Sequence, residues 1–277
     1  MELDVNELFF WDPIALEGTA LAVNRVVLLM FIAAIACMTF FVIGARRSAL
    51  VPKGIQNLVE MAYLFVRNNI AIDVIGPEGI KYANYLAALF FFIFFSNLLE
   101  IVPGINFPVT SRMALPAMLA LITYFVFIVV GISKHGLRYF KDIAFPPGVP
   151  TWVYFLLTPI EIFSTFIVRP FTLAVRLFAN MVAGHVLLTI FFLFTHDFLV
   201  HNIGPMSPFG VVTLLVAAAL ILFELLVISL QAYIFTMLTA SYIGEAIAGH
   251  GEHEEEEHST AEPVTETEGL ATASASH

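Results

Sequence analysis

The most constraining feature of this sequence is that long stretches of it contain no charged residue. Three such stretches cover Val26–Ile43, Tyr82–Leu99 and Met113–Ser133. A helix that crosses a bilayer needs about 20 mostly apolar residues, so each stretch is long enough to span a membrane. The composition agrees, because only 12% of the residues are charged, against roughly 25% in an ordinary soluble domain. These observations exclude a soluble enzyme, a nucleic-acid-binding protein and a disordered chain, and they predict an all-α polytopic membrane protein.

The C-terminal half contains two longer apolar stretches, at about residues 151–195 and 209–245, separated by a polar break that includes Pro205. The second stretch has no proline, and no glycine between Gly210 and Gly244. As one helix it would be about 50 Å long at 1.5 Å per residue, whereas the hydrocarbon core is about 30 Å thick. Each stretch therefore forms either two short spans or one long, strongly tilted helix. The lack of turn-forming residues favours the long helix.

The long-helix interpretation predicts five membrane-crossing helices, the last two of them paired as a tilted hairpin. A single membrane domain then covers residues 25–249, with spans at about 25–45, 82–102, 113–133, 151–195 and 209–245. Cytoplasmic loops carry an excess of Lys and Arg, and such clusters follow the first and third spans: Arg46, Arg47 and Lys53, then Lys134, Arg138 and Lys141. The acidic N-terminus, residues 1–24, is therefore expected outside the cytoplasm and the C-terminus inside it.

Two segments outside the spans have a distinct character. Residues 52–68 place apolar side chains at helical spacing between polar ones, which is typical of an amphipathic helix lying at the membrane interface; its apolar positions are Ile55, Leu58, Val59, Ala62 and Val66. Residues 250–277 hold eight glutamates and no Lys or Arg, which predicts a disordered acidic tail. The histidines of this tail could bind a metal weakly, but a solvated tail is the favoured interpretation.

Of the ionisable residues inside the long apolar stretches, three are informative: Arg176, His185 and Glu224. Glu161 and Arg169 lie nearer the start of the first stretch. A charged side chain at the centre of a membrane helix costs about 2.5–3.5 kcal/mol on insertion scales, so such residues usually face a protein interior or a water-filled path. An arginine near the end of a span can extend its charge to the interface, but Arg176 has apolar neighbours on both sides. We therefore expect a functional role for Arg176.

Helical geometry separates these groups. At 100° per residue, Arg169 and Arg176 share a face within about 20°, Asn180 lies close to that face, and His185 lies about 180° from Arg176. On the last helix, Glu224 and Gln231 are seven residues apart and share one stripe.

If the two long helices form a hairpin, His185 and Glu224 lie at similar distances from its turn and could meet. Such a pair could be a proton relay or a buried hydrogen-bonded pair without a transport role, and spacing alone leaves both open. The sequence contains no nucleophile triad, phosphate-binding loop or metal-ligand spacing, and its one cysteine, Cys37, excludes an internal disulfide. We therefore expect no catalytic residue, no cofactor and no metal site.

Three segments together resemble subunit a of the rotary, F-type ATP synthase. They are RPFTLAVRLFANMVAGH at Arg169–His185, ISLQAYIF at Ile228–Phe235 and SNLLEIVPG at Ser96–Gly104. The resemblance covers nearly the whole chain in order and leaves out only the tail. A stand-alone secondary transporter and a structural membrane scaffold are the alternatives. The first lacks the expected internal repeat, and the second does not explain the charged residues inside the spans.

The resemblance implies a stator that lies beside a ring of c subunits in a bacterial plasma membrane, together with peripheral-stalk b subunits and the rest of the complex. Two offset aqueous half-channels would lead protons to and from the ring carboxylates. Arg176 matches the essential arginine, whose charge would prevent a proton short circuit between the half-channels. Asn180, His185, Glu224 and Gln231 match positions along the proton path, whereas Glu161 and Arg169 match polar positions near the cytoplasmic end. The implied subunit is not catalytic by itself, and the proton is its transported ion.

Overall fold

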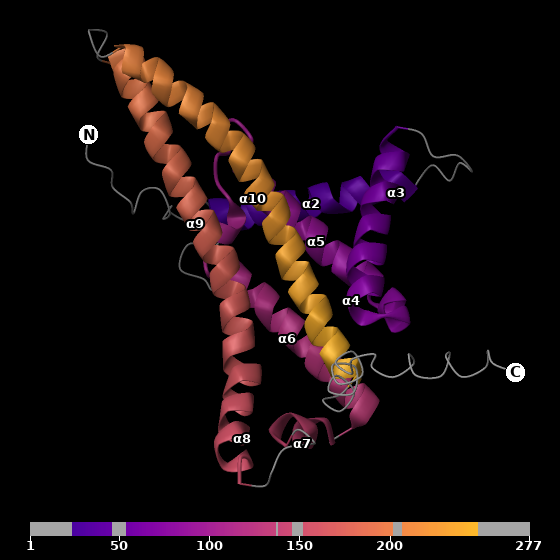
Figure 1. Cartoon of the computed structure of the whole chain (residues 1–277). Coiled ribbons are helices and arrows are strands. Elements are labelled where there is room, and N and C mark those ends of the chain that lie inside the picture. Colours follow the sequence, from indigo (N-terminus) through magenta and orange to yellow (C-terminus); the bar gives the residue numbers. More distant parts are fainter. Residues whose placement is uncertain (1–23, 46–53, 137, 146–151, 202–206, 249–277) are drawn as a thin grey trace, which may run out of the picture.

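The structure, a computed structural model, describes residues 24–45, 54–136, 138–145, 152–201 and 207–248. Within these ranges it consists of helices joined by turns, with no strand, which confirms the all-α prediction (Figure 1). The interpretations of the N-terminal 23 residues and of the tail at 250–277 concern parts of the chain outside the described residues.

Four helices in the described ranges are long and apolar enough to cross a membrane: Arg25–Gly44, Ala114–His135, Tyr154–Val200 and Pro208–Ala248. The first is α2 (Arg25–Ala45) and the second is α6 (Ala114–His135). They agree with the predicted spans at 25–45 and 113–133.

The helix in the predicted second span is shorter than expected. Helix α5 covers Ala83–Leu98, 16 residues, or about 24 Å at 1.5 Å per residue. From Leu99 the chain continues in turns, within which Gly104 and Asn106 have positive φ, 88° and 42°. The prediction of a helix as far as residue 102 was therefore wrong, and the described residues contain four full-length candidate spans plus this shorter apolar helix.

The predicted amphipathic segment is helical, but its apolar face is divided. Helix α3 (Ile55–Val66) continues through a π-helical turn (Arg67–Ile72) into α4 (Asp73–Ile75), so the helical region extends beyond residue 68. Val59 and Val66 are buried, whereas Ile55 and Leu58 are exposed. Since α3 packs against α2 and α5, one side of the apolar face contacts the protein and the other points outward.

The last two apolar stretches each form one long helix, which for the final stretch the absence of turn residues predicted. Helix α8 (Tyr154–Phe163) continues through a π-helical turn (Ser164–Val168) into α9 (Arg169–His196). A last π-helical turn carries the chain on to His201. Helix α10 is unbroken over 42 residues, Ser207–Ala248.

Helices α9 and α10 run antiparallel as a hairpin whose arms spread apart with distance from the turn (Figure 1). Helix α6 packs against both arms, and α5 packs against α10. A short helix, α7 (Arg138–Ala144), follows α6. A 3-10 turn at Val109–Ser111 packs against α9. The loop after α5 is thereby brought against the middle of the membrane hairpin.

Candidate functional site

Helix α9 presents two chemically different faces. Arg176 and Asn180 are exposed, together with the small residues Ala179 and Ala183. His185 is buried, with 6% of its surface exposed. The helical period predicts that Arg176 and His185 lie about 180° apart around α9. In the structure, Arg176 lies on the exposed, outer face and His185 on the buried, inner face.

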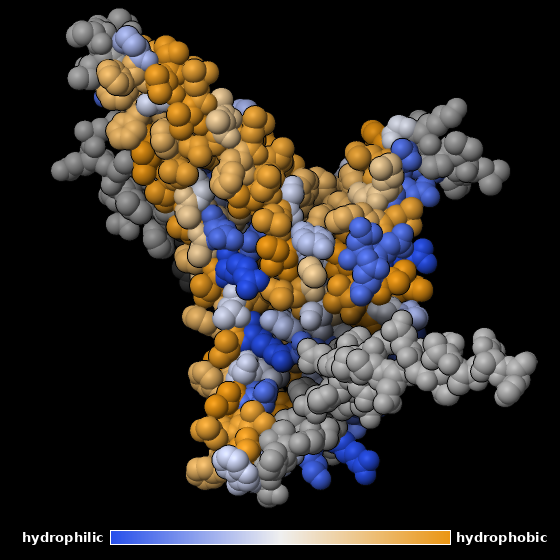
Figure 2. Space-filling model, viewed as in Figure 1, coloured by the Kyte–Doolittle hydropathy of each residue, from blue (hydrophilic) through white to orange (hydrophobic). Residues whose placement is uncertain are grey.

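Polar contacts join α9 to α10 along the hairpin. Near the turn, the Thr195 hydroxyl donates to the Thr213 hydroxyl over 3.0 Å. In the middle, Nδ2 of Asn180 donates to Oε1 of Gln231 over 2.7 Å. Towards the open end, Arg169 forms a salt bridge with Glu245. Figure 2 shows hydrophilic residues gathered in a band between the two helices, bordered by apolar surface.

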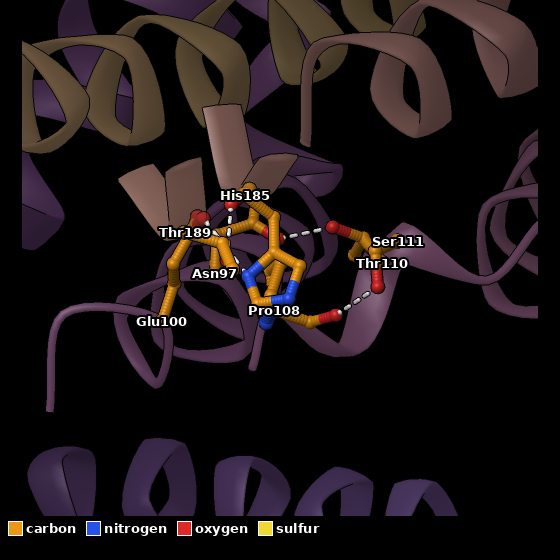
Figure 3. Close-up of polar contacts among 7 residues, drawn as sticks. All are labelled: Asn97, Glu100, Pro108, Thr110, Ser111, His185 and Thr189. Carbon is orange, nitrogen blue, oxygen red and sulfur yellow. Dashed lines mark hydrogen bonds and ion pairs between the residues drawn. The ribbon is translucent and has the colours of Figure 1, made fainter. Parts of the chain in front are cut away.

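The inner face of α9 contributes to a buried ionisable cluster. Nδ1 of His185 lies 3.6 Å from Oε1 of Glu100, which belongs to the turn after α5. Figure 3 shows the imidazole of His185 between Glu100 and the segment that carries Pro108, Thr110 and Ser111. The Phe107 ring packs edge-on against the imidazole, with 5.6 Å between ring centroids.

Glu224 completes this cluster from α10. Its side chain is buried, with 4% exposed, and its carboxylate rests against α9 at Gly184, the residue before His185. The Glu224 carboxylate also lies within electrostatic range of Glu100. The structure thus adds Glu100 to the predicted pair of His185 and Glu224: Glu100 lies against His185, and the Glu224 carboxylate lies against the neighbouring Gly184.

A hydrogen-bond network holds the turn that carries Glu100. The Thr110 hydroxyl donates to Oδ1 of Asn97, and the Ser111 hydroxyl donates to the carbonyl of Pro108 over 2.8 Å. Both hydroxyl groups are buried. The network ties the end of α5 to the 3-10 turn packed on α9, so it fixes Glu100 at the level of His185 (Figure 3).

The cluster contains more polar atoms than the surrounding protein can satisfy. Several buried side-chain atoms have no hydrogen-bond partner among the described residues: Ser96 Oγ, Asn97 Nδ2, both Glu100 oxygens and Glu224 Oε1. Buried polar atoms without a protein partner are normally hydrogen-bonded to ordered water. The arrangement therefore favours a hydrated interior at this level of the hairpin, where a proton can be held and passed on.

The remaining predicted positions lie elsewhere along the hairpin. Gln231 is buried, with 2% exposed, and its Nε2 has no hydrogen-bond partner in the described part of the chain. The guanidinium of Arg169, besides its salt bridge to Glu245, lies 5.1 Å from the centroid of the Tyr242 ring. Glu161 is half-buried on α8, and the carboxylate that the structure pairs with Arg169 is Glu245 instead.

Sequence reasoning did not assign Glu100 and Glu245 to the site. A signal for Glu100 was available, because it is a carboxylate directly after an uncharged apolar stretch, inside the segment SNLLEIVPG. Glu245 gave no such signal, because it lies close to the end of its apolar stretch, where a charge is unremarkable. Among the described residues, no group of three or more His, Cys, Asp or Glu side chains is arranged to hold a metal ion.

Comparison with known proteins identifies one family. The family described as ATP synthase A chain matches residues 27–244. A subunit a of ATP synthase from Frankia alni is 49% identical over 246 residues, which are 88% of this chain and 84% of the relative. The corresponding protein of Parafrankia sp. is 48% identical over 84% of this chain and 81% of its own length. That of Rhodococcus erythropolis is 43% identical over 86% and 88%, respectively.

Proposed function

The chain belongs to the ATP synthase subunit a family, and on that premise we propose how its residues carry protons through the membrane sector of the complex. Subunit a is the proton-translocating, non-catalytic membrane subunit, and the rest of the synthase is its partner. The proposal is that two separate polar regions of the α9–α10 hairpin serve as two half-channels, with Arg176 between them.

The first half-channel is the buried cluster of His185, Glu100 and Glu224. Its support is that three titratable groups, from α9, from α10 and from the turn after α5, are buried at this level of the hairpin, with 3.6 Å between Nδ1 of His185 and Oε1 of Glu100. Both oxygens of Glu100 and Oε1 of Glu224 have no hydrogen-bond partner among the described residues, which favours bound water there. A histidine and carboxylates in a hydrated membrane cavity can exchange protons in sequence.

The ring of c subunits contacts the outer face of α9. Arg176 and Asn180 are exposed there beside Ala179 and Ala183, and small side chains permit close approach of another membrane helix. The guanidinium keeps its proton at physiological pH, so Arg176 cannot pass a proton on. A proton that leaves the cluster therefore has to travel on the ring, and this couples proton flow to rotation.

The second half-channel follows the band towards the open end of the hairpin, where Arg169, Tyr242 and Glu245 lie. In the proposed orientation this end of the hairpin faces the cytoplasm and the N-terminus lies outside. Helix α5 then crosses the membrane as well, which brings the number of crossings to five. Reporter fusions at the two ends of the chain should then give opposite topology signals. Equal signals would mean an even number of crossings.

The observation that carries the proposal is the placement of Arg176 and His185 on opposite faces of one helix, one exposed and one buried. The test is ATP-driven proton pumping by inverted vesicles. Arg176→Ala should abolish coupled pumping while the complex still assembles, and Arg176→Lys should also fail, because a desolvated lysine can lose its proton. The control is Arg138→Ala, which removes an exposed arginine from α7 and should leave pumping unchanged. Near-normal coupled pumping by Arg176→Ala would overturn the role of the arginine.

Two further measurements separate the proposal from its alternatives. A ring of small c-type subunits should co-purify with the chain in mild detergent, which neither a stand-alone transporter nor a scaffold predicts. His185→Ala and Glu224→Ala should each slow passive proton conductance through the membrane sector without removing it, since water can bridge a partly lost relay. Wild-type conductance in both variants would mean that the cluster is only a buried polar contact.

A further inference from the structure

Gly184 lies on α9, where this helix faces Glu224 of α10. A Cβ added to Gly184 would lie 2.5 Å from both carboxylate oxygens of Glu224 and 2.7 Å from its Cδ. Ordinary van der Waals contacts of a Cβ begin at 3.4 Å. The Glu224 carboxylate therefore occupies the space that any other residue at position 184 would fill with its side chain.

The position of this contact relates it to the cluster. Gly184 directly precedes His185, whose Nδ1 lies 3.6 Å from Oε1 of Glu100. By resting on the backbone of α9, the Glu224 carboxylate is directed inward instead of away from the hairpin, and it stays 4% exposed. A carboxylate pushed off α9 would be separated from its partners in the cluster.

We propose that Gly184 is a positioning residue for proton transfer. Its missing side chain leaves a recess on α9, the carboxylate seat, that holds the Glu224 carboxylate next to the residue that precedes His185. The inference rests on the proposed role of this cluster as a half-channel. An alanine at position 184 would force the carboxylate back by about 1 Å, and misplacement of a reacting group by about that distance can cost up to 10²-fold in rate.

The test measures passive proton conductance through the membrane sector after removal of the catalytic head, normalised to assembled complex. Gly184→Ala should lower conductance by about tenfold or more. Glu224→Asp shortens the side chain by one C–C bond, about 1.5 Å, which makes room for the added methyl group. The double variant Gly184→Ala/Glu224→Asp should therefore conduct better than Gly184→Ala alone.

The matched control is Gly210→Ala, near the turn of the same hairpin. Its Cβ would also meet a neighbour closely, Cγ of Leu199 at 2.7 Å, but that neighbour is apolar. Conductance close to wild type is expected from this variant. A loss equal to that of Gly184→Ala would show that tight helix packing, and not the carboxylate seat, is the cause, and would overturn the inference.

The remaining outcomes distinguish this inference from the proposed function. If Glu224→Ala slows conductance but Gly184→Ala does not, the positioning role is wrong and the half-channel stands. If Glu224→Ala conducts like wild type, the half-channel itself is wrong. If Gly184→Ala fails to assemble, recovery of assembly in the Glu224→Asp background supports the seat, and continued failure in that background overturns it.

Discussion

The hydrogen bond between Asn180 and Gln231 allows a quantitative test of how the hairpin is held together. Gln231 is buried with 2% exposed, whereas Asn180 lies on the outer face of α9. Asn180→Ala would remove the donor and leave Oε1 of Gln231 buried without its partner. Gln231→Met would remove both polar atoms while keeping a side chain of similar length.

The expected magnitude follows from these environments. Double-mutant cycles on hydrogen bonds between membrane helices give about 0.6 kcal/mol on average and about 1.7 kcal/mol at most. Burial of Gln231 places this bond above the average, and exposure of Asn180 keeps it below the maximum, so we expect a coupling energy of about 1 kcal/mol. Asn180→Ala alone should cost about 1–2 kcal/mol, since an acceptor left unsatisfied adds its desolvation cost. Gln231→Met should be near neutral, because Nε2 of Gln231 is already unpartnered within the described residues.

The assay is the free energy of unfolding in mixed detergent micelles, measured by circular dichroism for wild type, both single variants and the double variant. A control cycle pairs Asn180→Ala with Ser229→Ala, because the Ser229 hydroxyl bonds the Leu225 carbonyl of its own helix. The two effects in the control should add. A coupling energy between Asn180 and Gln231 no larger than that of the control would refute the reasoning.

Two other contacts give direct predictions. Arg169→Gln and Glu245→Gln should each destabilise the hairpin by about 1–3 kcal/mol, between the range for exposed ion pairs and that for buried ones. The reason is that the two side chains are partly exposed, 22% and 34%. In the same unfolding assay, the double variant should lose less stability than the sum of the two single losses. The hydrogen bond from Lys134 to Glu78, 2.8 Å long, holds the pKa of Glu78 below its ordinary value of 4.5. The stability that this pair contributes is therefore present above pH 4.5. It is lost as the pH falls through the lowered pKa of Glu78. Lys134→Ala should raise the Glu78 pKa towards 4.5 in a carbon-13 NMR titration, and an unchanged titration curve would count against the contact.

Several properties of this protein follow from the sequence alone, because they depend on neighbours along the chain. The absence of proline and glycine between Gly210 and Gly244 favours an unbroken helix, as α10 is. The 3.6-residue period separates Arg176 from His185 whatever the helix packs against. A motif of adjacent residues identifies the family for the same reason, since it needs no knowledge of contacts between distant segments.

The tertiary structure decided which charged groups meet. Glu100 reaches His185 because the end of α5 is hydrogen-bonded to the 3-10 turn at Val109–Ser111, which packs against α9. Nothing in the spacing of these residues along the chain requires that arrangement. Arg169 pairs with Glu245, 76 residues away, and not with the nearer Glu161. The length of α5 was also misjudged, because apolar composition continues past Leu98 while the backbone turns at Gly104 and Asn106. Local sequence fixes where helices form and which faces they carry, but contacts between helices depend on how all of them pack at once.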